Sequence, residues 1–218
     1  NLIPLYSNIL LRGAGMDQTI IEAEDNSQLA ILTISGTNVH VEGLTLRNGG
    51  GNGRSNGGGM YVTTNDDVTI YSVHFDDNAV NARGAGIYVE RYGGVTAYNT
   101  VFTNNVTTFY GGAIYGYTDS NIVVLHSAFQ HNEAQMGSSI AGYGTLTVNY
   151  SCMADTGDVT ESISAATNLA YNYWTTSGQN PRLTEPPDIC NALDIPDLVI
   201  ADGDVQALYD ALDFANTT

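Results

Sequence analysis

One outline recurs three times in this sequence at a constant step of 27 residues. The copies are "GGGMYVTTNDDVTIYSVHFDDN" at 57–78, "GAGIYVERYGGVTAYNTVFTNN" at 84–105 and "GGAIYGYTDSNIVVLHSAFQHN" at 111–132. They align without a gap. A repeat of this length at a fixed period indicates a solenoid, a propeller or an array of stacked units. A fold in which equivalent residues lie one above another is therefore expected.

The residues within each copy favour strands over helices. Apolar residues alternate with polar ones in stretches such as Val68-Thr69-Ile70-Tyr71, which is the period of a β-strand. Gly and Asn punctuate these stretches. A propeller blade of four strands needs about 40 residues, whereas 27 residues suit one coil of a parallel β-helix. The predicted fold is an all-β parallel β-helix over 1–180, with weaker copies that place Leu46 and Met153 in the Phe column.

Two columns of the alignment are predicted to lie inside the solenoid. A Phe recurs in each copy, and an Asn follows it three residues later. Stacked Phe rings would fill the core, and stacked Asn amides would pair with turn backbone groups that burial otherwise leaves unpaired. The predicted inner ladder consists of Phe75, Phe102, Phe129, Asn78, Asn105 and Asn132.

Charge narrows the classes of partner. The net charge is −17, and all six basic residues are Arg. A nucleic-acid partner is not expected because phosphate binding needs a cationic surface. No apolar run is long enough for a membrane span.

The "GGAI" at 111–114 and the units "FDDN", "FTNN" and "FQHN" resemble the repeats of polymorphic outer-membrane-protein adhesins. More broadly, they resemble right-handed parallel β-helix surface proteins of the pectin-lyase-like superfold. The segment "ISAATNLAYNYW" at 163–174 is similar to the closing rung of such proteins. The resemblance implies a right-handed coil and an extracellular or cell-surface location, often with an adhesive role. Nothing in the chain resembles the membrane barrel that anchors autotransporter adhesins.

Catalysis is not predicted, although β-helices also host polysaccharide lyases and hydrolases. A hydrolase needs two carboxylates across the sugar bond. Asp76 aligns with Thr103 and Gln130, and Asp77 aligns with Asn104 and His131, so neither carboxylate repeats in its column. A lyase would need a cationic base and calcium-binding carboxylates. No catalytic residue and no cofactor is therefore predicted.

The His and Asp residues of the repeats could have either a structural or a ligand-binding role. His74 is expected to be packed or half-buried rather than catalytic. His126 and His131 lack a metal-ligand partner in register. The pairs Asp66-Asp67 and Asp76-Asp77 are expected to be solvated, with calcium binding at a turn as the alternative.

A column of tyrosines is predicted on the outer surface. It is either a cross-strand ladder that stabilises the sheet or a surface for binding sugars or proteins. The candidate residues are Tyr61, Tyr88, Tyr115, Tyr71 and Tyr98.

Covalent modification has one candidate disulfide and two candidate glycan sites. Cys152 and Cys190 would form a disulfide in an oxidising compartment, the alternative being two buried thiols. Asn149 and Asn216 begin N-x-S/T sequons and are candidate glycan sites. Asn105 also begins a sequon, but it belongs to the predicted inner ladder.

The end of the chain differs in character from the repeats. Residues 181–196 are Pro-rich and are predicted to be a linker, and 197–218 are predicted to form a short strand and a helix. The apolar residues of this tail are Leu198, Val199, Ile200, Val205, Leu208, Tyr209, Leu212 and Phe214. A solenoid needs caps at its ends. This tail is expected to cap the start of a neighbouring copy or of the next repeat, or to cover its own last rung.

The expected function is that of an extracellular structural or adhesive module that assembles head to tail with copies of itself or with adjacent repeats of a longer chain. Surface glycans and host or cell-surface proteins are the other expected partners. The alternatives are a carbohydrate-binding module that uses the outer tyrosines and, less favoured, a polysaccharide lyase or hydrolase.

Overall fold

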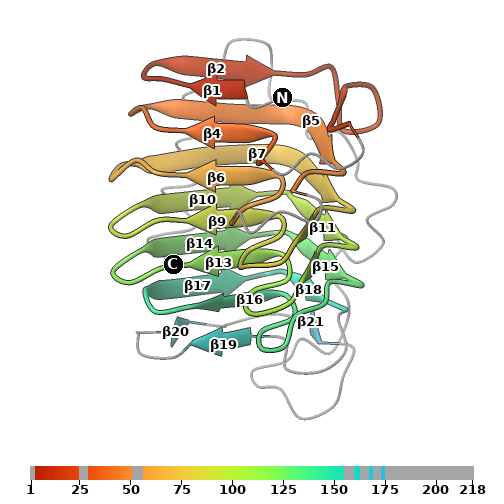
Figure 1. Ribbon diagram of the computed structural model, residues 1–218, viewed down its shortest axis with the longest axis vertical. Helices are drawn as coiled ribbons and strands as arrows, with labels where there is room; N and C mark the ends of the chain where they lie inside the picture. Colours follow the sequence, from red (N-terminus) through yellow and green to blue (C-terminus); the bar gives the residue numbers. More distant parts are fainter. Residues whose placement is uncertain are drawn as a thin grey trace.

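The computed structural model describes residues 3–24, 29–50, 56–154, 160–162, 167–168 and 173–174. These residues form a stack of parallel strands without a helix (Figure 1). The stack makes about five turns, and equivalent strands lie about 27 residues apart. The predicted parallel β-helix is therefore confirmed, while its handedness stays an implication of the resemblance.

One side of the solenoid is a seven-stranded parallel sheet, called sheet A below. Its strands are short, and their order in the sheet follows their order in the chain. Its strands are β1 (Ile3–Leu5), β4 (Leu32–Ile34), β6 (Met60–Val62), β9 (Ile87–Val89), β13 (Ile114–Gly116), β16 (Ile140–Gly142) and β19 (Thr160–Ser162).

A twelve-stranded sheet forms the other two faces. The first of these faces contains β2 (Ile9–Arg12), β5 (Val39–Arg47), β7 (Asp67–Asp76), β10 (Gly94–Tyr98), β14 (Asn121–Leu125), β17 (Thr145–Asn149) and β20 (Thr167–Asn168). The second contains β3 (Ile20–Glu22), the ends of β5 and β7, β11 (Val101–Thr103), β15 (Ala128–Gln130), β18 (Cys152–Met153) and β21 (Tyr173–Trp174). Strands β8 (Ala79–Val80) and β12 (Val106–Thr107) pair separately.

The strand register matches the alignment of the repeats. Leu46 pairs with Phe75 and Phe129 pairs with Met153, as the weaker copies predict. In the last of these copies, Asn121 pairs with Thr145, so that turn is three residues shorter than the 27-residue repeat. Backbone pairing also extends to Trp174, opposite Met153.

The predicted Phe ladder fills the core. Phe75, Phe102 and Phe129 are fully buried, and their rings stack with centroids 5.1 and 4.8 Å apart at 6°. Ile and Val from the three faces complete the same apolar cluster. Each coil is too thin to bury these side chains alone, so the core exists only through stacking.

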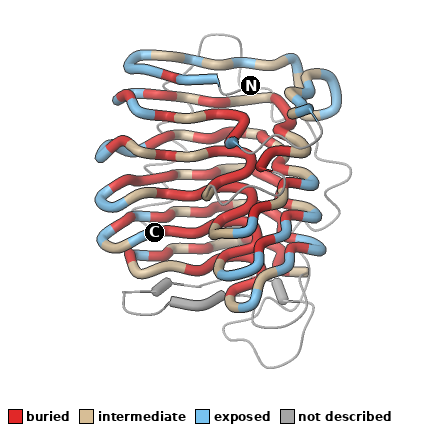
Figure 2. Tube along the Cα trace, viewed as in Figure 1, coloured by how far each residue is buried: buried red, intermediate tan, exposed pale blue. Residues whose placement is uncertain are grey.

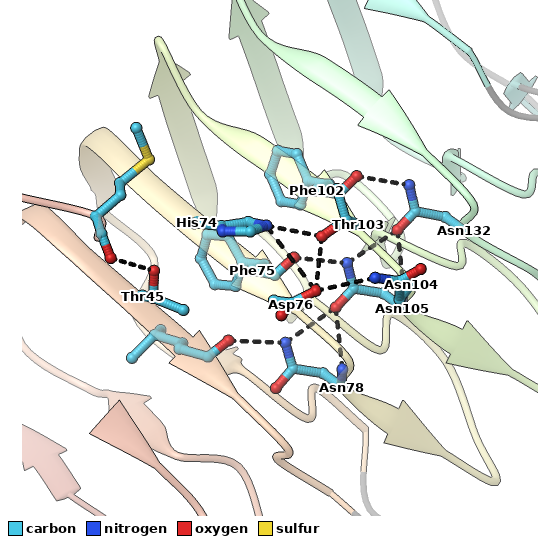
Figure 3. A network of polar contacts seen from close by, with 12 residues as sticks. Thr45, His74, Phe75, Asp76, Asn78, Phe102, Thr103, Asn104, Asn105 and Asn132 are labelled. Carbon is cyan, nitrogen blue, oxygen red and sulfur yellow. Dashed lines mark hydrogen bonds and ion pairs between the residues drawn. The ribbon is translucent and has the colours of Figure 1, made fainter. Parts of the chain in front are cut away.

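The predicted Asn ladder is also confirmed, and Figure 3 shows its bonds. The Asn105 side chain donates to the carbonyl of Phe75 and to Oδ1 of Asn132, both at 2.9 Å. Its own Oδ1 accepts from the Asn78 side chain at 2.9 Å. All three amides are buried, so the ladder satisfies backbone groups at a turn that water does not reach.

A second polar ladder lies at the corner between the two faces of the larger sheet. Thr100, Ser127 and Ser151 are fully buried there. The Ser127 hydroxyl accepts from the Thr100 backbone N–H, and the Ser151 hydroxyl accepts from the Ser127 N–H, both at 3.1 Å. The equivalent residues in earlier turns are Leu44 and Val73, and there the strand continues through the corner as β5 and β7. Where the residue carries a hydroxyl, the strand divides in two.

Glycine is required at the corner that precedes sheet A. Gly57, Gly84, Gly111 and Gly137 have φ between 60° and 68°. A Cβ at Gly84 would lie 2.2 Å from the carbonyl oxygen of Ile87. The glycines that open each copy thus serve the predicted tight corner.

The first turn is more exposed than the turns that follow it (Figure 2). Ile9, Leu11 and Ile21 face the core but are only partly buried, and Leu10 and Ile20 are 48% and 46% exposed. Among the described residues, β1 pairs only with β4, and β2 and β3 pair only with β5. The linker 181–196 and the tail 197–218 lie outside the described residues.

Candidate functional site

His74, Thr103 and Asp76 form a polar cluster on the outer face of the β7–β11 pair (Figure 3). His74 Nε2 lies 2.7 Å from Thr103 Oγ1, and that hydroxyl donates to Asp76 Oδ1 at 2.7 Å. Asn104 donates to the same oxygen at 3.1 Å. Because the single Thr103 proton points at Asp76, the His74 ring must donate to Thr103.

This direction of donation decides what the cluster can do. An activated nucleophile needs a base that takes the hydroxyl proton, whereas His74 here gives a hydrogen bond to Thr103. Burial lowers the pKa of His74 and outweighs the opposing effect of Asp76 and Asp17. The expected half-buried His74 is confirmed, and the cluster holds two rungs together by neutral and charge-assisted hydrogen bonds.

Asp76 and Asp67 do not face another carboxylate in register on the neighbouring described rungs. In register with Asp76 are Arg47 on one side and Thr103 on the other. Asp67 pairs with Gly94, and partial desolvation of its carboxyl group, followed by the charge of Asp66, raises its pKa. The two carboxyl groups that a glycosidase places across a sugar bond are therefore not supplied by these columns.

The remaining metal candidates are His126 and His131. His131 is exposed, and His126 packs between Tyr98 and Tyr150, with centroids 5.1 and 5.2 Å apart. Within the described ranges, no group of three or more His, Cys, Asp or Glu side chains could hold a metal ion. Asp66, Asp67 and Asp77 are exposed.

The predicted outer tyrosine ladder is present on sheet A. Tyr61, Tyr88 and Tyr115 are in register on β6, β9 and β13. Their ring centroids lie 5.3 and 5.5 Å apart. Tyr61 donates its hydroxyl to Glu90 at 2.8 Å, and burial together with this bond raises the pKa of Tyr61 to about 12.

The exposure of this ladder differs from the expected open surface. Tyr88 is 3% exposed and Tyr115 is fully buried. Arg83 and Tyr110, from turns between the strands, lie against Tyr115. Burial raises the pKa of Tyr115 to about 12. The ladder therefore packs as a small outer core, and two of its rings are not free to stack on a ligand.

The other two predicted tyrosines form a ridge on a different face. Tyr71 and Tyr98 stack at 11° with centroids 5.7 Å apart, and Leu125 completes the row. Tyr71 is buried and Tyr98 is half-buried. Tyr98 also contacts the ring of His126, which stacks on Tyr150. The sequence alignment did not reveal these contacts, because His126 and Tyr150 are offset from the Tyr column.

The modification candidates have different outcomes. Cys152 is buried on β18, and Cys190 lies outside the described residues, so their disulfide stays a prediction. Asn149 ends β17 and is half-buried, while Asn216 also lies outside the described residues.

Comparison with protein-family models, curated proteins and solved structures finds no match to this chain. The resemblance to adhesin repeats therefore rests on the sequence motifs alone. Within the described part of the chain, no helix is long and apolar enough to cross a membrane.

Proposed function

We propose that this chain is an extracellular structural or adhesive module whose solenoid continues head to tail into another copy or an adjacent repeat. The observation that carries the proposal is the first turn, where β1, β2 and β3 have no partner strand on their outer edges among the described residues and the apolar side chains are partly exposed. No catalytic role is proposed, because the polar columns hold rungs together rather than pair carboxylates.

An open strand edge favours pairing with another strand. Soluble proteins usually protect such edges with charges, Pro or a covering element. Here the core-facing residues Ile9, Leu11 and Ile21 stay partly exposed, so a further rung would bury them as the inner rungs bury Val41 and Leu46. Strand addition would supply the missing backbone partners.

The tail 197–218 is proposed as the part of a neighbouring copy that covers this edge. Its predicted short strand and amphipathic helix have the composition of a solenoid cap. A contact between different surfaces of two copies does not close, so it propagates a filament.

Sedimentation velocity of the 218-residue chain over a range of concentrations tests this proposal. Wild type should associate as concentration rises. Leu11→Lys, which places a charge on the open core, should stay monomeric. Leu10→Lys is the matched control, since Leu10 points outward on the same strand. Deletion of 197–218 should leave a folded but non-assembling solenoid. A wild type that never associates, or a deletion that unfolds the chain, would overturn the proposal.

A further inference from the structure

Arg83 differs from the other arginines that the structure describes. Each of the others makes an ion pair: Arg12 with Glu42, Arg47 with Glu22 and Arg91 with Asp119. Arg83 makes no ion pair with any described residue, although the chain carries a net charge of −17. A cation without a counter-ion among the described residues of so acidic a chain calls for an explanation.

The Arg83 side chain is held by aromatic rings. Its guanidinium carbon lies 5.6 Å from the ring centroids of both Tyr110 and Tyr115, and these rings are 6.2 Å apart. The backbones of Arg83 and Tyr110 also form a parallel bridge. Stacking leaves the hydrogen-bond donors of a guanidinium unused, so an oxyanion can compete for them.

Two buried polar atoms in this cluster have no partner among the described residues. They are Nε of Arg83 and the hydroxyl oxygen of Tyr115. Arg83 Nε can only donate a hydrogen bond, and the Tyr115 hydroxyl can donate one too. Buried donors are nearly always paired in native proteins, so each of these two atoms calls for an acceptor. An anionic oxygen would satisfy both donors and the unpaired charge.

We propose that the Arg83–Tyr110–Tyr115 cluster binds the carboxylate of an acidic sugar. Tyr110 is half-buried and its neighbour Phe109 is 47% exposed, so an aromatic surface for the sugar ring lies beside the two donors. A neutral sugar would leave the donors unpaired, and a simple anion would leave the aromatic surface unused. This proposal gives a specific site and ligand class to carbohydrate binding, the alternative function expected from the sequence. It does not depend on head-to-tail assembly.

Titration of the 218-residue chain with D-glucuronate, followed by NMR, tests this site. D-glucose and acetate are the matched probes, since each lacks one half of the proposed ligand. D-glucuronate should bind more tightly than either. Arg83→Gln and Tyr115→Phe should each weaken its binding about tenfold or more, because each removes a hydrogen bond to a charged group. Arg91→Gln removes the same charge from an exposed ion pair and should leave binding unchanged.

Folding and assembly are separated from binding in this test. Tyr115→Phe deletes only a hydroxyl that has no partner among described residues, so its thermal midpoint should match or exceed that of wild type. Equal affinity for D-glucuronate and acetate would overturn the proposal. So would unchanged affinity in both site variants, or a crystal structure at high D-glucuronate in which a water alone bridges Arg83 and Tyr115.

Discussion

Two columns of identical aromatic residues run along this solenoid at the same spacing, and they differ in what surrounds them. The Phe75, Phe102 and Phe129 rings are all fully buried and lie within 6° of parallel. The outer tyrosines are tilted by 62° at one contact and 18° at the next, and their burial increases along the stack. The regular core fixes the orientation and burial of the inner rings, whereas irregular turns determine the tilt and burial of the outer rings.

The cause of this difference lies in the covering residues. Inside, Phe102 stacks between Phe75 and Phe129, and the apolar side chains of Leu46 and Met153 continue the column, so an apolar environment repeats with the sequence. Outside, Arg83 and Tyr110 cover Tyr115, and Glu90 binds the hydroxyl of Tyr61. Repetition in a sequence therefore establishes register, while burial of an outward residue depends on turns that do not repeat.

The largest expected effect is on the inner column. Phe102→Ala should lower the free energy of unfolding by about 3–5 kcal/mol, because it opens a cavity between two stacked rings. Urea denaturation measures this loss. A loss below about 1 kcal/mol would show that the inner column does not carry the core.

The Asn ladder should be the next most sensitive. Asn105→Ala removes bonds to the Phe75 carbonyl, Asn78 and Asn132 in a buried turn. A buried polar group left without a hydrogen-bond partner costs about 1–3 kcal/mol, so we expect the free energy of unfolding to fall by about 2–4 kcal/mol. Asn121→Ala, at an exposed position, is the control in the same denaturation experiment. Equal losses would contradict the ladder's role.

Two tyrosines of the outer column differ in burial and can be compared by mutation. From the alignment alone, Tyr88→Ala is expected to cost about 1 kcal/mol or less as a surface ladder residue. Its burial changes this expectation to about 2–4 kcal/mol. Tyr61→Ala, at the more exposed end, should cost about 1 kcal/mol. Matching midpoints for the two variants would show that the covering turns contribute nothing.

The smallest expected effect is a pH dependence. Burial lowers the pKa values of His74 and His126, so the folded chain binds fewer protons than the unfolded chain. Stability should be full above the unfolded value of about 6.5 and should fall as pH drops below it. The groups that act on His74 are Asp76, Asp17 and Arg47. Denaturation at about pH 7.5 and about pH 5.5 measures the fall, and His74→Gln with His126→Gln should reduce it. A fall of the same size in the double variant would contradict this assignment.

The fold was predictable because identical residues stack on one another in this kind of solenoid. The Phe and Asn columns, the glycine corner and the shorter turn before Met153 all follow from alignment of the repeats. The hydroxyl ladder was not predictable, because Leu44 and Val73 occupy the same column as Thr100, Ser127 and Ser151. The Arg83 cluster was also missed, since Arg83 and Tyr110 come from turns and pack against Tyr115 of β13 only after folding.

Hydrogen exchange at several protein concentrations tests the proposed assembly most directly. The first turn should gain protection when another copy covers its edge, while the inner rungs are protected throughout. We predict that the amides of 9–12 and 20–22 become more protected as concentration rises, and that those of 95–98 do not change. Protection of the first turn that is independent of concentration would contradict the claim that this end is an assembly surface.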